Sequence, residues 1–161
     1  MRQVERGART IRPGTLMQKA IPPRLVEPYL TGRRSIIAGF VYRVQDSTFD
    51  DPAEFYDALD LRYDGSDFTP DLTEVYFLRW SAVAVDSYRV PYSPENGGDW
   101  RGKPPFTGTG FTSSRARRVA EYYTDPIPVP VGAEMYRITP GAEEFIARFD
   151  GQVWLRPSGG I

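Results

Sequence analysis

Apolar residues along this chain occur in short stretches separated by glycine and proline, and most of these stretches have the composition of β-strands. Residues 35–44 (SIIAGFVYRV) are rich in β-branched and aromatic side chains, which is typical of a buried strand. The C-terminal part repeats this composition three times, and an Asp-Gly pair marks one of its turns. The pattern predicts about six strands, at 35–44, 74–80, 82–90, 133–138, 143–149 and 152–156.

A helical pattern follows the first of these strands. In residues 50–61 (DDPAEFYDALDL), Asp51 is a favourable N-cap and Pro52 suits the first helical position. Glu54 stands three residues after Asp51, where a capping box has its acid. These signals predict a helix that begins after Asp51.

Two other segments carry helical signals. A short helical turn is expected after Pro23 and is interrupted by Pro28, because proline cannot continue the hydrogen-bond ladder. In residues 110–123 (GFTSSRARRVAEYY), apolar side chains recur at helical spacing and predict a helix over 115–123. The glycine- and proline-rich stretch 91–110 predicts a long loop, and such loops are often functional.

The order of these elements indicates the fold class. No strand–helix–strand alternation and no glycine-rich dinucleotide fingerprint is present, so a parallel sheet is not expected. The expected architecture is α+β, with antiparallel strands and with helices near the N-terminal half. Residues 1–15 hold four arginines and predict a loose lead-in, and residues 16–161 predict a single globular domain.

The composition excludes several kinds of catalytic site and metal site. The chain has no histidine and no cysteine, which excludes Ser-His-Asp and Cys-His catalysis, disulfides and histidine- or thiolate-based zinc sites. No metal site is expected. The net charge of −1 makes nucleic acid an unlikely partner. The chain lacks a membrane-spanning stretch or a signal peptide, and we expect a cytoplasmic protein or part of a larger toxin that is exported or injected.

Three segments contain residues that could bind a ligand or take part in catalysis. Arg43 ends a strand suited to burial, where it would form a structural salt bridge with Asp46 or bind a phosphate or carboxylate. Ser113 and Ser114 would cap the predicted helix, and a helix N-terminus also attracts anions. Glutamates near the C-terminus would lie on solvated hairpin ends or act as a general base; these are Glu134, Glu143 and Glu144. Because adjacent strand residues face opposite ways, Glu143 and Glu144 cannot both line one cleft.

Together these places resemble the cholera-toxin and pierisin-like branch of the ADP-ribosyltransferases. In that branch a Tyr-Arg pair ends the first strand, a serine-containing strand follows, and a glutamate motif precedes the last strands. The segments VYRVQDSTFDDPAEF, FTSSRARRVA and GAEEFIARFDG stand here in the same order. The first segment would match the family at Tyr42, Arg43, Asp46, Pro52, Glu54 and Phe55.

The resemblance implies two antiparallel sheets around a cleft that binds NAD as the substrate. Arg43 would anchor the phosphate or ribose, Thr112 and Ser113 would brace the site, and Glu144 would hold the nicotinamide ribose. Tyr122 or Tyr123 would shield the ribosyl cation that forms when nicotinamide leaves. Ala142 stands where the family has an acidic or amide residue, so hydrolysis of NAD and ADP-ribosyl transfer both remain open.

Other functions also fit the sequence. One is a non-enzymatic binding module, such as an immunity or adaptor protein whose aromatic-rich sheet and loop 91–110 contact a partner. An RNA-cleaving toxin using Arg, Tyr and Glu is disfavoured by the near-neutral charge. For the enzyme, the expected partner is a protein target or a cognate immunity protein.

Overall fold

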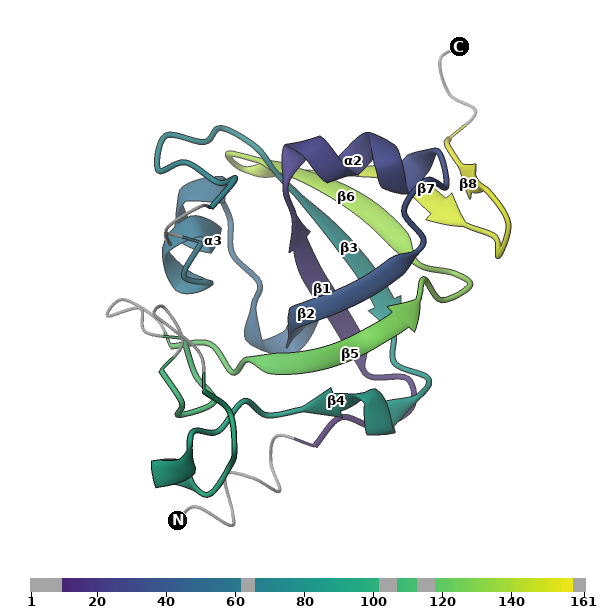
Figure 1. Ribbon diagram of the computed structural model, residues 1–161. Coiled ribbons are helices and arrows are strands. Elements are labelled where there is room, and N and C mark those ends of the chain that lie inside the picture. Colours follow the sequence, from purple (N-terminus) through teal and green to yellow (C-terminus); the bar gives the residue numbers. More distant parts are fainter. Residues whose placement is uncertain (1–9, 62–65, 102–106, 113–117, 158–161) are drawn as a thin grey trace.

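The computed structural model describes residues 10–61, 66–101, 107–112 and 118–157. Its strands form a single antiparallel sheet in the order β4-β5-β2-β1-β3-β6-β7-β8 (Figure 1). Two short α-helices accompany the sheet, so the α+β prediction is confirmed. The strands are β1 (Leu16–Ile21), β2 (Ile36–Arg43), β3 (Val75–Ser81), β4 (Tyr88–Arg89), β5 (Tyr122–Pro128), β6 (Glu134–Thr139), β7 (Ala142–Phe149) and β8 (Trp154–Leu155).

The expectation of two separate sheets is wrong, because β1 pairs with β2 on one side and with β3 on the other. The β1–β2 ladder contains only Met17 opposite Arg43 and Gln18 opposite Tyr42, whereas β1 and β3 pair along all of β1. The sheet therefore bends sharply between β1 and β2. Figure 1 shows β2 and β5 turned away from the direction of β1 and β3.

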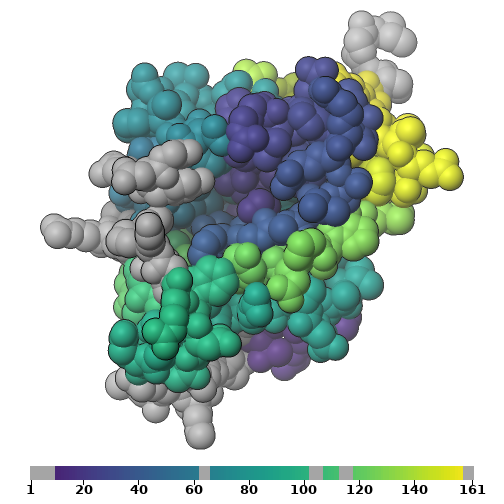
Figure 2. Space-filling model, in the orientation of Figure 1, coloured from purple at the N-terminus to yellow at the C-terminus, as the bar shows by residue number. Residues whose placement is uncertain are grey.

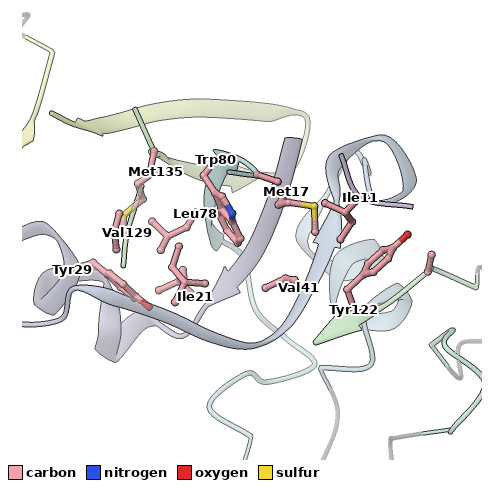
Figure 3. Close-up of a cluster of buried hydrophobic side chains, with 14 residues drawn as sticks. Ile11, Met17, Ile21, Tyr29, Val41, Leu78, Trp80, Tyr122, Val129 and Met135 are labelled. Carbon is pink, nitrogen blue, oxygen red and sulfur yellow. The ribbon is translucent and has the colours of Figure 1, made fainter. Parts of the chain in front are cut away.

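The two helices pack against different core clusters. Helix α2 (Pro23–Leu30) buries Tyr29 in a first cluster with Met17, Leu78 and Trp80 (Figure 3). Helix α3 (Pro52–Ala58) buries its side chains in a second cluster, on the other face of β1 and β3. In the space-filling view, α2 and β2 occupy the front surface and hide most of β1 (Figure 2).

Helix α3 begins as its sequence predicts. The Asp51 carboxylate accepts a hydrogen bond of 3.0 Å from the Glu54 N–H, and the Glu54 carboxylate accepts one of 3.2 Å from the Asp50 N–H. This reciprocal capping satisfies N–H groups that have no partner inside the helix. Phe55, on the inner side of the helix, is fully buried.

Helix α2 differs from its prediction, because it continues past Pro28 to Leu30. Two tertiary contacts make this possible despite the missing N–H of the proline. Tyr29 is buried and donates its hydroxyl to the Ile36 carbonyl at 2.7 Å, and the Arg34 N–H donates to the Pro28 carbonyl at 2.9 Å. Tertiary packing therefore outweighs the local cost of the proline.

The strand predicted at 82–90 is mostly wrong. Only Tyr88 and Arg89 pair, as β4, and they follow a 3₁₀ turn, η2 (Val85–Ser87). The turn is closed by the Ser87 hydroxyl, which donates to the Ala84 carbonyl at 2.7 Å. A serine that bonds its own neighbouring backbone in this way competes with strand formation.

The helix predicted over 115–123 is also wrong where the structure describes it. Residues 118–121 are not helical, and β5 begins at Tyr122. Ser113 and Ser114 lie outside the described residues. The predicted loop 91–110 is confirmed in its described parts, which contain a 3₁₀ turn, η3 (Pro94–Asn96), and one isolated bridge between Tyr92 and Thr109.

The C-terminal strands follow their predictions more closely. β6 and β7 form a hairpin whose turn has Gly141 at φ +72°, a conformation that favours glycine. β8 is shorter than predicted and pairs two residues with the end of β7. None of the helices in the described part of the chain is long and apolar enough to cross a membrane.

Candidate functional site

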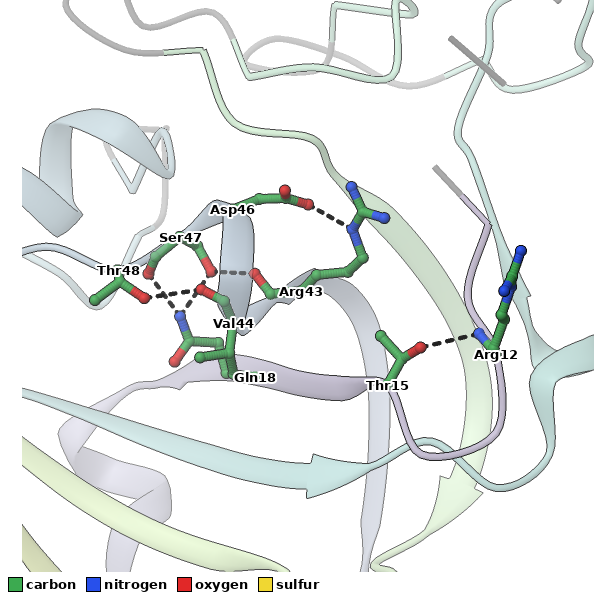
Figure 4. Close-up of polar contacts among 8 residues, drawn as sticks. All are labelled: Arg12, Thr15, Gln18, Arg43, Val44, Asp46, Ser47 and Thr48. Atoms are coloured by element: carbon green, nitrogen blue, oxygen red, sulfur yellow. Dashed lines mark hydrogen bonds and ion pairs between the residues drawn. The ribbon is translucent and has the colours of Figure 1, made fainter. Parts of the chain in front are cut away.

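Arg43 is the last residue of β2, and its side chain is held in place there. Its Nε donates to the Asp46 carboxylate at 2.5 Å, within a 3₁₀ turn, η1 (Val44–Asp46), that follows β2 directly (Figure 4). The residue is only 8% exposed. The salt bridge to Asp46 that the sequence suggested is confirmed. It fixes the orientation of the guanidinium plane, which is the geometry an anion anchor needs.

Tyr122 lies beside Arg43. The guanidinium carbon is 5.8 Å from the centre of the Tyr122 ring, at the outer limit of a cation–π contact. Tyr122 is opposite Val41 in the β2–β5 ladder and is buried in the first core cluster. The structure therefore brings together Arg43 and Tyr122, two of the residues predicted to bind the substrate.

Thr112 braces the approach to β5. Its N–H donates to the Val119 carbonyl at 2.9 Å, and its hydroxyl accepts from the Val119 N–H at 3.0 Å. The neighbouring residue Phe111 forms a bridge with Ala120. Because β5 pairs with β2, these contacts place Thr112 at the same corner of the sheet as Arg43. We name this region, formed by the end of β2, η1, residues 110–112 and residues 118–122, the Arg43 corner.

Glu144 does not lie at the Arg43 corner. It is on β7, and β1, β3 and β6 separate that strand from β2 in the sheet order. Its carboxylate accepts from Arg137 at 3.4 Å. The sequence had suggested that an arginine and a C-terminal glutamate converge, and the structure does not bring Glu144 and Arg43 together.

Glu143 and Glu134 lie on the other face of the sheet, where they flank Arg79. Glu143 pairs with Arg79 at 2.6 Å, and Glu134 is opposite Arg79 in the β3–β6 ladder. Since Glu144 pairs with Arg137 instead, the prediction that Glu143 and Glu144 face opposite ways is confirmed.

Arg79 is the centre of a polar network that sequence analysis did not identify. Its Nε donates to the Gln18 side chain at 2.9 Å, and its guanidinium carbon lies 4.5 Å from the centre of the Tyr136 ring. Burial and the charge of Glu134 raise the pKa of the Tyr136 hydroxyl above its ordinary value of 10.0, while Arg79 opposes them. These contacts neutralise Arg79 and hold it against the sheet.

The same network reaches the backbone of Arg43. Gln18 is fully buried and donates to the Ser47 carbonyl and hydroxyl, both at 2.7 Å (Figure 4). The Ser47 hydroxyl in turn donates to the Arg43 carbonyl at 2.7 Å. The end of β2 is therefore anchored by hydrogen bonds to the middle of the sheet. The only sequence signal was a glutamine among apolar residues.

Glu121 is a second functional candidate that the sequence analysis missed. It is 5% exposed, and its N–H donates to the Gly110 carbonyl at 3.0 Å, so it belongs to the Arg43 corner. In a helix over 115–123 its side chain would face solvent. In the extended conformation observed here it alternates with Tyr122, on the side of the chain that also carries the buried Val119. A buried carboxylate is a candidate for chemistry.

Tyr123 belongs to an aromatic group on the opposite face of β5 from Tyr122. Its ring centre lies 4.4 Å from that of Trp100 and 5.6 Å from that of Phe40. Arg89 lies over the Tyr123 ring at 5.2 Å. Because Tyr123 is less buried than Tyr122, it is the better placed of the two to offer an aromatic face to a ligand.

A small pocket lies beside α2, away from the Arg43 corner. It has a volume of about 60 Å³ and lies between the start of α2, residues 67–74 and β3. Pockets for drug-sized ligands measure roughly 300–1,000 Å³, so this one is too small for a dinucleotide. It is lined by Ile21, Pro23, Asp67, Phe68, Thr69, Leu72, Glu74, Val75 and Tyr76.

Among the described residues, acidic side chains form no group of three or more that could hold a metal ion. Comparisons of the chain with protein-family models, with curated proteins and with solved structures find no match.

Proposed function

We propose that the chain is an NAD-consuming enzyme, an ADP-ribosyltransferase or an NAD glycohydrolase, of the kind found in bacterial toxins and effectors. The observation that carries the proposal is the fixed guanidinium of Arg43 at the end of β2. Asp46 orients it through Nε, Tyr122 lies against it, and residues 110–112 lie at the same corner. A preorganised guanidinium suits the diphosphate of NAD.

The chemistry needs few protein groups, which fits a chain without histidine and cysteine. The bond between nicotinamide and ribose breaks, and nicotinamide leaves with the bonding electron pair. The ribosyl group carries positive charge in the transition state, and a carboxylate stabilises it. Water then adds to the ribose carbon and releases a proton, which gives ADP-ribose, or a nucleophile of a protein target takes the place of water.

Two carboxylates are candidates for this role. Glu144 is favoured by the resemblance of its sequence motif, and Glu121 is favoured by its place at the Arg43 corner. Three strands separate Glu144 from Arg43, and the Glu121 side chain faces the opposite side of the chain from Tyr122, so mutation is needed to distinguish the two carboxylates. Release of nicotinamide distinguishes them, because it is lowered by mutation of Glu121 in one case and by mutation of Glu144 in the other.

The test is release of nicotinamide from NAD by the pure protein, with and without candidate protein acceptors. Arg43→Lys keeps the charge but loses the planar fork, and we expect it to lower the rate at least tenfold, which is about 1.4 kcal/mol. Glu121→Gln and Glu144→Gln then identify the acid. Glu27→Gln, on the exposed side of α2, is the matched control and keeps the full rate.

Two results would overturn the proposal. One is the absence of nicotinamide release with every acceptor, from a protein whose fold is verified by circular dichroism. The other is an Arg43→Lys variant with unchanged activity, which would place the reaction elsewhere.

A binding module is the second candidate function, because three exposed apolar residues share one face of the sheet. Leu16, Phe145 and Leu155 are 55%, 36% and 54% exposed, and the strand registers place them on the face that also carries Arg79. Exposed apolar side chains on one face of a sheet suit contact with another protein, such as a target or an immunity protein. Leu16→Ser with Leu155→Ser would abolish that contact in a binding assay and leave nicotinamide release unchanged.

A further inference from the structure

The small pocket beside α2 is formed by three parts of the chain. Ile21 ends β1, Pro23 begins α2, and residues 67–74 lead into β3 beside them (Figure 1). The pocket has a volume of about 60 Å³. A cavity needs roughly 10–15 Å³ to hold one water molecule, so this pocket takes a group of about four non-hydrogen atoms.

The loop that closes the pocket is held by its own hydrogen bonds. The Ser66 hydroxyl donates to the Leu61 carbonyl at 2.6 Å and accepts from the Phe68 N–H at 3.1 Å. The Leu72 N–H donates to the Thr69 carbonyl at 3.2 Å. Phe68 and Leu72 also pack against the second core cluster. This wall of the pocket is therefore preformed by the fold.

The lining combines apolar walls with two carboxylates, as sites for small ligands commonly do. The apolar walls come from Ile21, Pro23, Phe68, Leu72 and Val75. The carboxylates belong to Asp67 and Glu74, whose side chains are 37% and 39% exposed. The lining that the structure describes contains no arginine or lysine. A ligand that fits this lining therefore has an apolar part and a positive charge.

The ion pairs around the pocket leave an excess of negative charge. Asp67 pairs with Arg24 at 2.9 Å, and Glu74 pairs with Arg137 at 2.8 Å. Arg137 is shared, because it also pairs with Glu144 at 3.4 Å. These contacts contain three carboxylates and two guanidiniums, so one negative charge is not balanced within them. A ligand with a single positive charge would balance it.

Tyr76, which also lines the pocket, lies in the field of these charges. Burial and the charge of Glu74 raise the pKa of its hydroxyl above the ordinary value of 10.0. Glu144 acts in the same direction, and Arg137 opposes them. The direction of the shift agrees with a pocket that favours positive charge.

The positions of the two carboxylates favour an ammonium over a guanidinium. The ion pairs use Oδ2 of Asp67 and Oε2 of Glu74, so the other oxygen of each can accept from a ligand. A guanidinium binds best when its planar fork meets both oxygens of one carboxylate. An ammonium has three hydrogens that point in different directions, and it can donate to oxygens of two separate carboxylates.

We propose that this pocket binds a primary ammonium group carried on a short aliphatic stem. The apolar walls would contact the stem, and Asp67 and Glu74 would accept from the ammonium. A free alkylamine and the end of a lysine side chain share this chemistry. The proposal does not rest on the proposed NAD chemistry, and its test does not use nicotinamide release.

The experiment is an NMR titration of the labelled protein with n-butylammonium chloride, in place of NaCl at constant ionic strength. The amide signals of Thr69, Leu72 and Val75 are expected to shift to saturation, with a Kd of roughly 1 mM for so small a ligand. 1-Butanol has the same stem without the charge, and ammonium chloride has the charge without the stem. Each is expected to bind at least about tenfold more weakly.

A parallel titration identifies the source of the amine. The peptide Gly-Lys-Gly with blocked ends presents the same ammonium on a protein side chain. A lower Kd for the peptide than for n-butylammonium assigns the pocket to a lysine of a partner protein, whereas an equal or higher Kd assigns it to a free amine.

Variants test the two carboxylates. Glu74→Gln keeps the shape of the side chain and is expected to raise the Kd for n-butylammonium about fivefold. Asp67→Asn is expected to act in the same way, and it leaves the pairs of Arg137 intact if Glu74→Gln disturbs folding. Asp125→Asn is the matched control. It changes an exposed aspartate on β5 that pairs with Arg89, and it keeps the wild-type Kd.

Three outcomes overturn the proposal. In the first, n-butylammonium does not shift the amide signals of Thr69, Leu72 and Val75 to saturation. In the second, 1-butanol binds as tightly as n-butylammonium, which would mean that the carboxylates do not select a cation. In the third, Asp125→Asn weakens binding as much as Glu74→Gln and Asp67→Asn do, which would mean general attraction of cations to the protein.

Discussion

Gln18 and Arg79 share a hydrogen bond of 2.9 Å in the middle of the sheet, across strands β1 and β3, which pair along all of β1. Gln18 uses its oxygen for Arg79 and its nitrogen for Ser47, so both ends of one buried amide are used. Through Ser47 the amide also holds the carbonyl of Arg43. The network thus joins the charged face of the sheet to the Arg43 corner.

Replacing Gln18 by leucine is expected to destabilise the fold by about 2–4 kcal/mol. The substitution removes the acceptor of the Arg79 Nε–H and the donor to the Ser47 carbonyl. Each of these groups then loses a hydrogen bond in the interior of the protein. Urea unfolding measures the effect. Gln45→Leu, at an exposed position of η1, is the control and is expected to change the free energy of unfolding by less than about 0.5 kcal/mol. Equal losses in both variants would contradict the role of Gln18.

Stability is expected to rise with pH between about 8 and 10.5 because of Lys19. In the folded protein burial and Arg34 lower the pKa of its ammonium, whereas in the unfolded chain the amine keeps its ordinary value. Between these values the unfolded chain binds more protons, so raising the pH favours the folded state. The gain is bounded by about 3 kcal/mol.

The measurement is the free energy of unfolding as a function of pH. Tyrosines and the N-terminus also titrate at these pH values, so the wild type is compared with Lys19→Met. The contribution of Lys19 is the difference between the two curves. Arg34 is the charged group that acts on the amine, and it is present in both proteins. A difference that stays constant with pH would show that Lys19 has an ordinary pKa in the folded state.

The β-strands with continuous apolar residues were predictable, and β1 was not. The observed ranges of four strands, β2, β3, β6 and β7, are close to the predicted ones. Their apolar side chains indicate a buried strand from the sequence alone. β1 contains Gln18 and Lys19, whose polar groups are satisfied by Ser47 and Phe40. Those partners are distant in sequence, so no local pattern marks the strand.

The segment before β5 misled the sequence analysis for a different reason. Val119, Ala120, Tyr122 and Tyr123 are compatible with a helical stripe and with a strand that is buried on both faces. The available edge of β2 decides between them, because Val41 pairs with Tyr122. Local periodicity cannot contain that information.

The candidate site was predictable only at its arginine. The Arg43–Asp46 pair is local in sequence, and a three-residue turn forms it. The position of Glu144 depends on the strand order, since β3 and β6 lie between β1 and β7. The burial of Glu121 depends on β5 being a strand.

Thr112→Val is expected to destabilise the fold by about 1–2 kcal/mol, because the Val119 N–H loses its acceptor inside the protein. Thr112→Ser keeps the hydroxyl and is expected to recover most of this loss. Thermal unfolding compares the two variants. If Thr112 acts only by bracing the Arg43 corner, Thr112→Ser also keeps the rate of nicotinamide release. A serine variant as unstable as the valine variant would show that the methyl group of Thr112 matters as much as its hydroxyl.

Asp46→Asn tests whether the Arg43 pair is an interior ion pair or a surface one. The side chains of Arg43 and Asp46 are 10% and 23% exposed, whereas those of the Arg24–Asp67 pair are 64% and 37% exposed. We expect Asp46→Asn to cost about 1–3 kcal/mol and Asp67→Asn less than about 1 kcal/mol. Unfolding measured at about 0.05 M and about 0.5 M NaCl distinguishes the two costs further, because salt screens exposed charges more than buried ones. The cost of Asp46→Asn should persist at high salt. If it vanished with that of Asp67→Asn, solvent would reach the guanidinium, and Arg43 would no longer be the rigid anchor that an anion site requires.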